Sequence, residues 1–151
     1  LFDDYDRENP AKLMRFRDVV NLLQMPGKEK ELKKDNVKPR VPYAKIWLER
    51  FAPEEDKFTV KEEFPEEALH LSGVQKMFLT KIADELTKKW KPEEFEKELY
   101  QVGKDLGLSP KDAFSAIYLS LIGKDHGPKA SQLILSLDKK FVRERFQEAA
   151  G

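Results

Sequence analysis

The chain contains no cysteine among its 151 residues, which excludes disulfides, thiolate nucleophiles and cysteine-ligated metals. This absence fits a reducing compartment, and we expect the protein in the cytoplasm. No apolar run approaches the roughly 18 residues that cross a bilayer, so no membrane partner is expected. No signal-peptide pattern opens the chain. It begins at Leu1 rather than at methionine, which indicates a piece of a longer protein.

Residues that usually carry catalysis are also scarce. The two histidines, His70 and His126, are far apart, and neither has a metal-ligand spacing such as H-E-x-x-H. No G-x-x-x-x-G-K-[S/T] run is present to hold a phosphate. Acidic pairs such as Glu93-Glu94 stand at an expected helix start, where the helix dipole favours them. The sequence therefore predicts no catalytic residue, no metal and no cofactor within this chain.

Charge is abundant but balanced. Lys and Arg number 28, as do Asp and Glu, so the formal net charge is zero, unlike that of a strongly basic nucleic-acid binder. Charged residues make up 37% of the chain, against a usual figure of about 25%. Dense mixed charge is typical of heat-adapted proteins. A thermophilic source is therefore our hypothesis, and a melting temperature of about 45–65 °C would contradict it.

The first third of the chain predicts two helices. One begins at Pro10 after the capping residue Asn9 and ends before Pro26-Gly27. Residues 28–40 have no apolar period, and we expect a solvated connection there. Pro42 opens the second helix, which is expected to carry four apolar side chains on one face: Tyr43, Ile46, Trp47 and Phe51. Residues 57–63 alternate in polarity and predict at most one short β-like segment.

The rest of the chain predicts a succession of short helices. The first starts at Ser72-x-x-Gln75, a capping box, and is expected to continue an apolar stripe from Val74 and Met77 as far as Trp90. The later helix boundaries are marked by proline, glycine or aspartate: Pro92, Gly107, Pro110, Gly123, Pro128 and Asp138. Short connections imply antiparallel or steeply crossing neighbours. The predicted fold class is all-α, a multi-helix bundle of short helices.

Two basic stretches near the carboxyl end are the strongest candidates for ligand binding. Residues 123–129 join two predicted helices, with glycines at both ends and three possible donors among them. Residues 139–146 place four basic side chains around two phenylalanines. Lysines neutralise phosphates, and arginine planes stack on unpaired bases. The candidate RNA contacts are Lys124, His126, Lys129, Arg143 and Arg145. The alternatives are an ordinary interhelical turn and a solvated helix face.

A third basic stretch surrounds Trp90, with Lys88, Lys89 and Lys91 as neighbours. Because Trp90 continues the expected apolar stripe, core packing is favoured over base stacking. From the residues alone, the prediction stops at a helical domain with a locally basic carboxyl-terminal face.

Motifs in residues 107–146 resemble the carboxyl-terminal region of class I lysyl-tRNA synthetases. In that family a Gly-[Ile/Leu]-x-Pro-Lys helix start is followed by a Leu-[Leu/Ile]-Gly-Lys-x-x-Gly-Pro turn and a Leu-Asp-Lys-x-Phe-Val ending. The matching residues here are Gly107, Leu108, Pro110, Lys111, Phe114, Ala116, Tyr118, Leu121, Ile122, Gly123, Lys124, Gly127, Pro128, Leu137, Asp138, Lys139, Phe141, Val142 and Arg145. Residues 43–54, YAKIWLERFAPE, are similar to a second segment of the same family, and FDDYDR at 2–7 resembles a third.

The resemblance implies that this chain is the tRNA-binding part of such an enzyme. Residues 1–64 would be a stem-contact-like helical subdomain and linker, and residues 65–151 a helical cage that receives the anticodon. The parent enzyme would join lysine to its tRNA with ATP as cofactor. Motifs of the His-Ile-Gly-His and Lys-Met-Ser-Lys-Ser types, which bind ATP in the family, are absent here. We therefore expect a monomer that binds lysine-accepting tRNA without catalysing aminoacylation.

The alternative is a non-catalytic helical protein–protein interaction module. A neutral chain with aromatic-rich helices suits both functions. RNA binding predicts an affinity that depends on the anticodon and falls steeply with salt, whereas a protein adaptor predicts neither.

Overall fold

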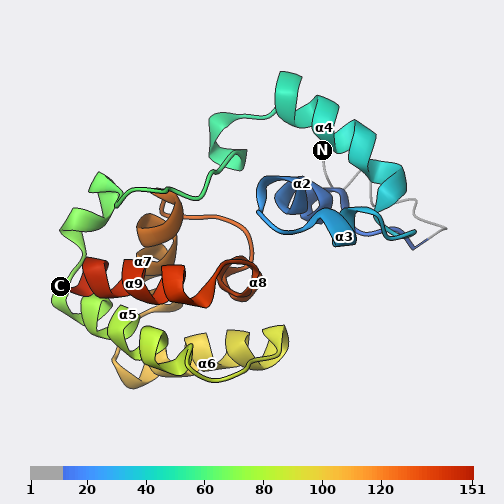
Figure 1. Ribbon diagram of the computed structural model, residues 1–151. Helices are drawn as coiled ribbons and strands as arrows, with labels where there is room; N and C mark the ends of the chain where they lie inside the picture. The colour runs from blue at the N-terminus through green and yellow to red at the C-terminus, as the bar shows by residue number, and fades with distance from the viewer. Residues whose placement is uncertain (1–11) are drawn as a thin grey trace. The chain divides into compact units, whose positions relative to one another are not determined.

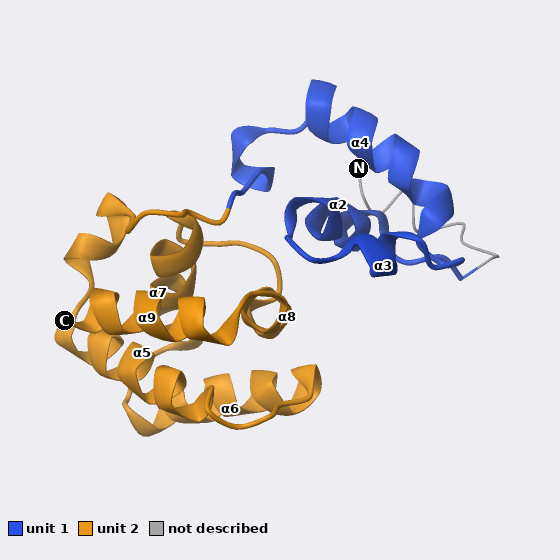
Figure 2. Ribbon diagram, viewed as in Figure 1, with its two compact units in different colours: residues 1–59 blue, residues 60–151 orange. Residues whose placement is uncertain are grey.

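A computed structural model describes residues 12–151, and every regular element in that range is a helix (Figure 1). The predicted all-α fold is confirmed, and residues 57–63 form no strand. The expected helix start at Pro10 and the segment 2–7 lie outside the described residues. The chain separates into two compact units, Leu1–Thr59 and Val60–Gly151 (Figure 2).

The first unit is built on two packed helices. Its elements are α2 (Phe16–Gln24), α3 (Glu29–Leu32), η1 (Lys38–Arg40), α4 (Val41–Arg50) and η2 (Glu54–Asp56). Helix α2 packs against α4, and the rings of Phe16 and Trp47 meet edge to face with centroids 6.2 Å apart. Both rings are buried, so Trp47 belongs to the core as the sequence favoured.

The segment 28–40 is largely exposed, as expected of a solvated connection, but it is more regular than the sequence indicated. It contains the short helices α3 and η1, and Val37 is completely buried. The buried guanidinium of Arg40 donates a hydrogen bond to the carbonyl oxygen of Met14 at 3.0 Å. Helices of three or four residues are too short to show an apolar period, so the hydrophobic pattern of this segment did not predict them.

Helix α4 also differs from the expectation of one apolar face. Trp47 and Ala44 are buried, but Tyr43, Ile46 and Phe51 are exposed to 63%, 47% and 69%. The spacing i, i+3, i+4 and i+8 would place the four side chains on one side of an ideal helix, but the buried face of α4 is made by Ala44 and Trp47, and Phe51 follows the last helical residue, Arg50. An apolar surface therefore remains open on this helix.

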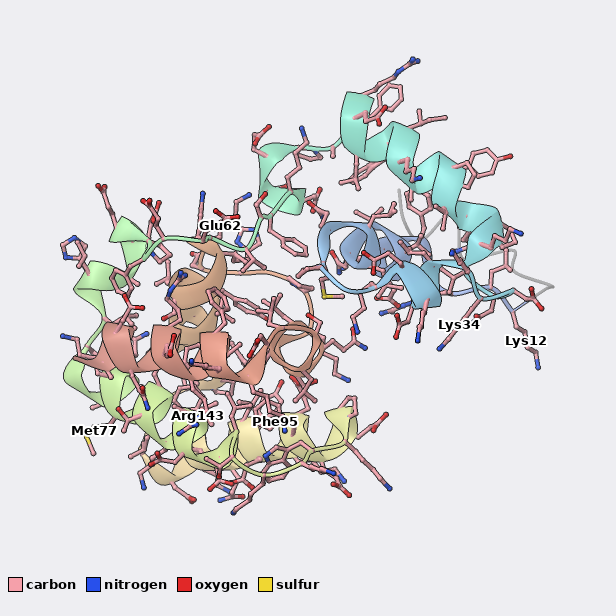
Figure 3. The ribbon with its side chains drawn as sticks, in the orientation of Figure 1. Lys12, Lys34, Glu62, Met77, Phe95 and Arg143 are labelled. Carbon is pink, nitrogen blue, oxygen red and sulfur yellow. The ribbon has the colours of Figure 1, made fainter. Side chains whose placement is uncertain are left out.

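The second unit is a bundle of one short and five longer helical segments among its described residues. These are η3 (Glu66–His70), α5 (Gly73–Glu85), α6 (Pro92–Asp105), α7 (Pro110–Ile122), α8 (Ala130–Ser136) and α9 (Lys139–Ala150). The most extensive packing is between α5 and α9 (Figure 1). The largest fully buried side chains of the core are Phe78, Leu79, Ile82, Leu86, Phe95, Leu99, Ile117, Leu121, Ile122, Leu133 and Phe146. Figure 3 labels Phe95, on α6.

Most helix ends of this unit follow the predicted signals. Ser72 and Gln75 form the reciprocal capping box, with hydrogen bonds of 3.1 and 2.9 Å. Asp138 caps α9 by accepting from the backbone N–H of Lys140. Gly107 and Gly123 have φ values of 77° and 71°, the left-handed conformation that glycine tolerates best.

Helix α5 is shorter than its apolar stripe suggested. It ends at Glu85, and Trp90 lies in the link to α6, where its indole N–H donates to the carbonyl oxygen of Glu85 at 2.7 Å. At the other end, Val74 and Met77 are exposed to 39% and 53% rather than buried. Trp90 is nevertheless half-buried against the ring of Phe95, with centroids 5.5 Å apart.

Candidate nucleic-acid interface

The loop at residues 123–129 is held firmly against α7. The hydroxyl of Tyr118 donates to the carbonyl oxygen of Pro128 at 2.6 Å. Gly127 lies so close that an added Cβ would be 2.9 Å from Ile122 Cδ1 and 3.0 Å from Tyr118 Cδ1. Gly123 supplies the left-handed turn that ends α7. The sequence signals of a glycine stop and a Gly-Pro return therefore produce a defined loop surface.

Tyr118 is suited to this role because it keeps its proton. Burial raises the pKa of its hydroxyl, and the nearby charges of Glu96 and Tyr100 raise that pKa further. The hydroxyl therefore donates to Pro128 throughout the physiological pH range.

Three of the predicted contacts share this loop. Lys129 and His126 are exposed and Lys124 is half-buried. The Nδ1 atom of His126 lies 2.8 Å from Asp125 Oδ1, and this hydrogen bond is the largest cause that lowers the pKa of Asp125. Asp125 is thus an anion at neutral pH and offsets part of the positive charge that the loop presents.

Arg145 is not a surface cation. Its side chain is buried, with 2% of the residue exposed. The guanidinium donates to the carbonyl oxygens of Ser120 at 3.0 Å and of Lys61 and Glu62 at 2.9 Å. Burial lowers its pKa, while Glu148 acts in the opposite sense.

Helical spacing explains why Arg145 points inward. It lies three residues after Val142 and four before Ala149, which are both buried on α9. We therefore assign Arg145 to the structural core of the unit and leave it out of the RNA-contact set.

Arg143 points to a different neighbour. Its Nε donates to the carbonyl oxygen of Ala83 on α5 at 3.3 Å, and the side chain is half-buried (Figure 3). The five predicted residues therefore do not form one cluster. Lys124, His126 and Lys129 lie together on the loop, whereas Arg143 and Arg145 are engaged with backbone carbonyls elsewhere.

Two basic stretches separated in sequence meet between α5 and α9. The amino group of Lys139 donates to the carbonyl oxygen of Lys88 at 3.1 Å. Lys88 is in turn paired with Glu85 at 3.3 Å, and Asp138 adjoins Lys139 in the sequence. Acidic side chains are therefore mixed with the lysines here, and the region is not a concentrated basic patch.

A groove of about 500 Å³ lies between the second half of α6 and the start of α7. Tyr100, which is 51% exposed, and Phe114 line it, with ring centroids 4.9 Å apart and ring planes at 77°. Lys104 is the only charged residue among those that line the groove. Sequence reasoning did not identify Tyr100 or Lys104, because both lie off the apolar stripe of α6 and read as ordinary surface residues.

Residues 47–150 match the anticodon binding domain family. The chain belongs to this family. Curated lysine–tRNA ligases are similar to it. The ligase of Archaeoglobus fulgidus is 39% identical over 114 residues, which cover 76% of this chain and 22% of the relative. The ligase of Methanosphaera stadtmanae is 38% identical over 119 residues, or 78% of this chain and 22% of the relative. The ligase of Pyrococcus horikoshii is 32% identical over 136 residues, or 86% and 26%.

This anticodon binding domain thus spans roughly a quarter of the relatives that it matches. The resemblance to lysyl-tRNA synthetases is confirmed. The glycines that carried it shape the anticodon binding domain: Gly107 and Gly123 adopt left-handed turns, and Gly127 allows Tyr118 to approach the loop. These motif residues therefore shape the backbone of the loop and of the helix ends.

Residues 12–151 were also compared with the requirements of metal sites and of membrane-spanning helices. No group of three His, Asp or Glu side chains in that range is placed to hold a metal ion. Within the same range, none of the helices has the length and apolar character needed to span a membrane.

Proposed function

We propose that this chain binds the anticodon of lysine-accepting tRNA as the carboxyl-terminal part of a lysine–tRNA ligase. The family match over residues 47–150 carries this proposal. The similar proteins are lysine–tRNA ligases, and this identifies lysine as the expected amino acid. The ligation of lysine to tRNA, with ATP as cofactor, belongs to the remainder of such an enzyme. The first unit would contact the tRNA stem, and the protein would act as a cytoplasmic monomer.

The loop at 123–129 is the proposed contact for unpaired nucleotides. The Tyr118–Pro128 hydrogen bond and the close packing of Gly127 hold the loop in one shape before RNA arrives. Preorganisation of this kind lowers the cost of ordering a surface on binding. Lys129 and Lys124 would neutralise phosphates, and His126 would donate or accept a hydrogen bond at a base edge.

Arg143 remains a secondary candidate in this proposal. Its guanidinium keeps donors beyond the Nε that bonds to Ala83, and the side chain is partly accessible. Arg143 points from α9 towards α5. A phosphate that it contacts would therefore lie over the packed pair α5 and α9.

A gel-shift titration with a lysine tRNA transcript tests the proposal. We expect affinity that falls when the anticodon is altered and that decreases steeply with salt. Lys129→Ala and Lys124→Ala should each weaken binding and reduce the logarithmic salt slope by about one. Lys81→Ala, an exposed lysine on α5, is the matched control. Unchanged affinity and slope for the loop variants would discard the loop, and binding that ignores the anticodon would discard the function.

A protein–protein interaction module is the second candidate. The exposed apolar side chains favour it: Tyr43 and Ile46 lie on α4 and Phe51 directly follows that helix, and exposed apolar groups of this kind can mark an interaction site. The same titration separates the two functions, since a protein adaptor shows no preference between anticodons.

A further inference from the structure

Aromatic side chains occur both beside the 123–129 loop and in the α6–α7 groove. Tyr118 packs against Gly127 and bonds to Pro128. Phe114 lies four residues earlier on α7, on the same side of the helix, and its ring meets that of Tyr100 on α6. Tyr100 also lies near enough to Tyr118 to influence its ionisation electrostatically. The aromatic residue at the proposed RNA loop and the one in the groove are therefore one helical turn apart on α7.

The groove has the size of a small-molecule or nucleobase site. Gly103 brings α6 close to α7, since an added Cβ would lie 3.2 Å from the Cβ of Ala113. The resulting hollow of about 500 Å³ falls within the usual size of binding clefts, roughly 300–1,000 Å³. Its walls are mostly apolar and include the half-exposed ring of Tyr100.

The two rings leave a surface for stacking. Their planes are nearly perpendicular, so each ring keeps at least one face that its partner does not cover. Half of Tyr100 is open to solvent. Lys104 follows Tyr100 by one helical turn and lines the same groove. An exposed aromatic face beside a single cation matches a nucleotide, which offers a flat base and one phosphate. An apolar peptide would not need the cation.

We propose that the α6–α7 groove receives one unpaired nucleotide of the bound tRNA, whose base stacks on Tyr100 and whose phosphate pairs with Lys104. This inference rests on the proposed function, because it extends the RNA path beyond the loop. The nucleotide neighbours those that Lys124 and Lys129 contact, since Tyr118 and Phe114 lie one helical turn apart on α7.

The test uses the 151-residue chain and an anticodon stem–loop RNA of lysine tRNA, labelled with 2-aminopurine at one loop position at a time. Fluorescence of 2-aminopurine is quenched when the base stacks on an aromatic ring. Tyr100→Ala should weaken binding by roughly 5- to 150-fold, the range for loss of one stacked base, and should abolish quenching at a single position. Tyr100→Phe should retain both. Lys104→Ala should lower the salt slope by about one.

Matched controls come from α5 of the same unit. Met77→Ala removes an apolar side chain of similar exposure, and Lys81→Ala removes an exposed lysine. Circular dichroism melting of every variant shows that the unit is folded under the binding conditions.

The outcomes separate the two proposals. If the unaltered chain shows no anticodon-dependent binding, the proposed function and the groove site both fail. If it binds, Lys129→Ala weakens binding, and Tyr100→Ala and Lys104→Ala behave like their controls, the groove site is overturned while the function stands. Equal losses for Tyr100→Ala and Tyr100→Phe would also overturn stacking as the role of this ring.

Discussion

The hydroxyl of Tyr118 lies 2.6 Å from the carbonyl oxygen of Pro128 and joins the middle of α7 to the residues that precede α8. The same ring covers Gly127. One side chain therefore fixes the loop surface on which three of the proposed RNA contacts stand. It also lies one helical turn from Phe114, which lines the groove.

Tyr118→Phe should change how stability depends on pH. The folded pKa of Tyr118 is raised by burial, so above pH ~10, the ordinary tyrosine value, the unfolded chain loses the proton before the folded chain does. The associated stability is complete below that pH and is lost as pH rises. Urea unfolding across the alkaline range should show a shallower decline for the variant. At neutral pH the variant should be about 1 kcal/mol less stable. Identical alkaline slopes would contradict this.

Arg145→Lys should destabilise the second unit without removing a charge. Lysine cannot reproduce the planar fork that serves three carbonyl oxygens. We expect a loss of about 2–4 kcal/mol in the free energy of unfolding, measured with chemical denaturant. Arg143→Lys, which alters one bond at 3.3 Å, is the control and should cost less than about 1 kcal/mol. A variant with normal stability but weakened tRNA binding would return Arg145 to the RNA-contact set.

Gly127→Ala should strain the loop. The new methyl group would stand 2.9 Å from Ile122 Cδ1 and 3.0 Å from the Tyr118 ring, and overpacking of this kind costs about 1–3 kcal/mol. The melting temperature should fall and tRNA binding should weaken. Gly73→Ala at the start of α5, where no atom lies within 4 Å, should be neutral or slightly stabilising. Equal melting temperatures for the two variants would show that the loop adapts at no cost.

Gln75→Ala should cost more than a surface glutamine normally does. Its side chain completes the capping box with Ser72 and also donates to the carbonyl oxygen of Asp112 at the start of α7. The expected loss is about 1–2 kcal/mol. Gln101→Ala, which removes one exposed bond to Asp105, should cost only a few tenths, about 0.3 kcal/mol. Thermal unfolding of both variants measures the difference.

Helix boundaries were the most predictable part of this fold, because their signals are local. Ser72, Asp138, Gly107 and Gly123 act through hydrogen bonds or backbone angles within one turn of themselves. Such features can be inferred without knowledge of the remaining chain. The family motifs indicated the same helix boundaries, because their glycines and prolines stand at these turns.

The candidate site was less predictable, because it depends on which distant elements meet. Nothing near Arg145 in the sequence shows that Ser120, Lys61 and Glu62 present carbonyl oxygens to it. Its spacing from Val142 on the helix was the one available signal. Tyr100 could not be identified from the sequence either, because its place in the groove depends on the ring of Phe114 on another helix.

The path of the chain into the second unit follows from the same arginine. Lys61 donates its backbone N–H to Leu121 at 2.8 Å, and Arg145 holds the carbonyl groups of Lys61 and Glu62. Anyone who trims this protein to its helical bundle for crystallography or binding work should therefore cut before Val60. A chain shortened to begin at Phe64 would lose two of the three carbonyl oxygens that accept from Arg145, and its second unit should be less stable.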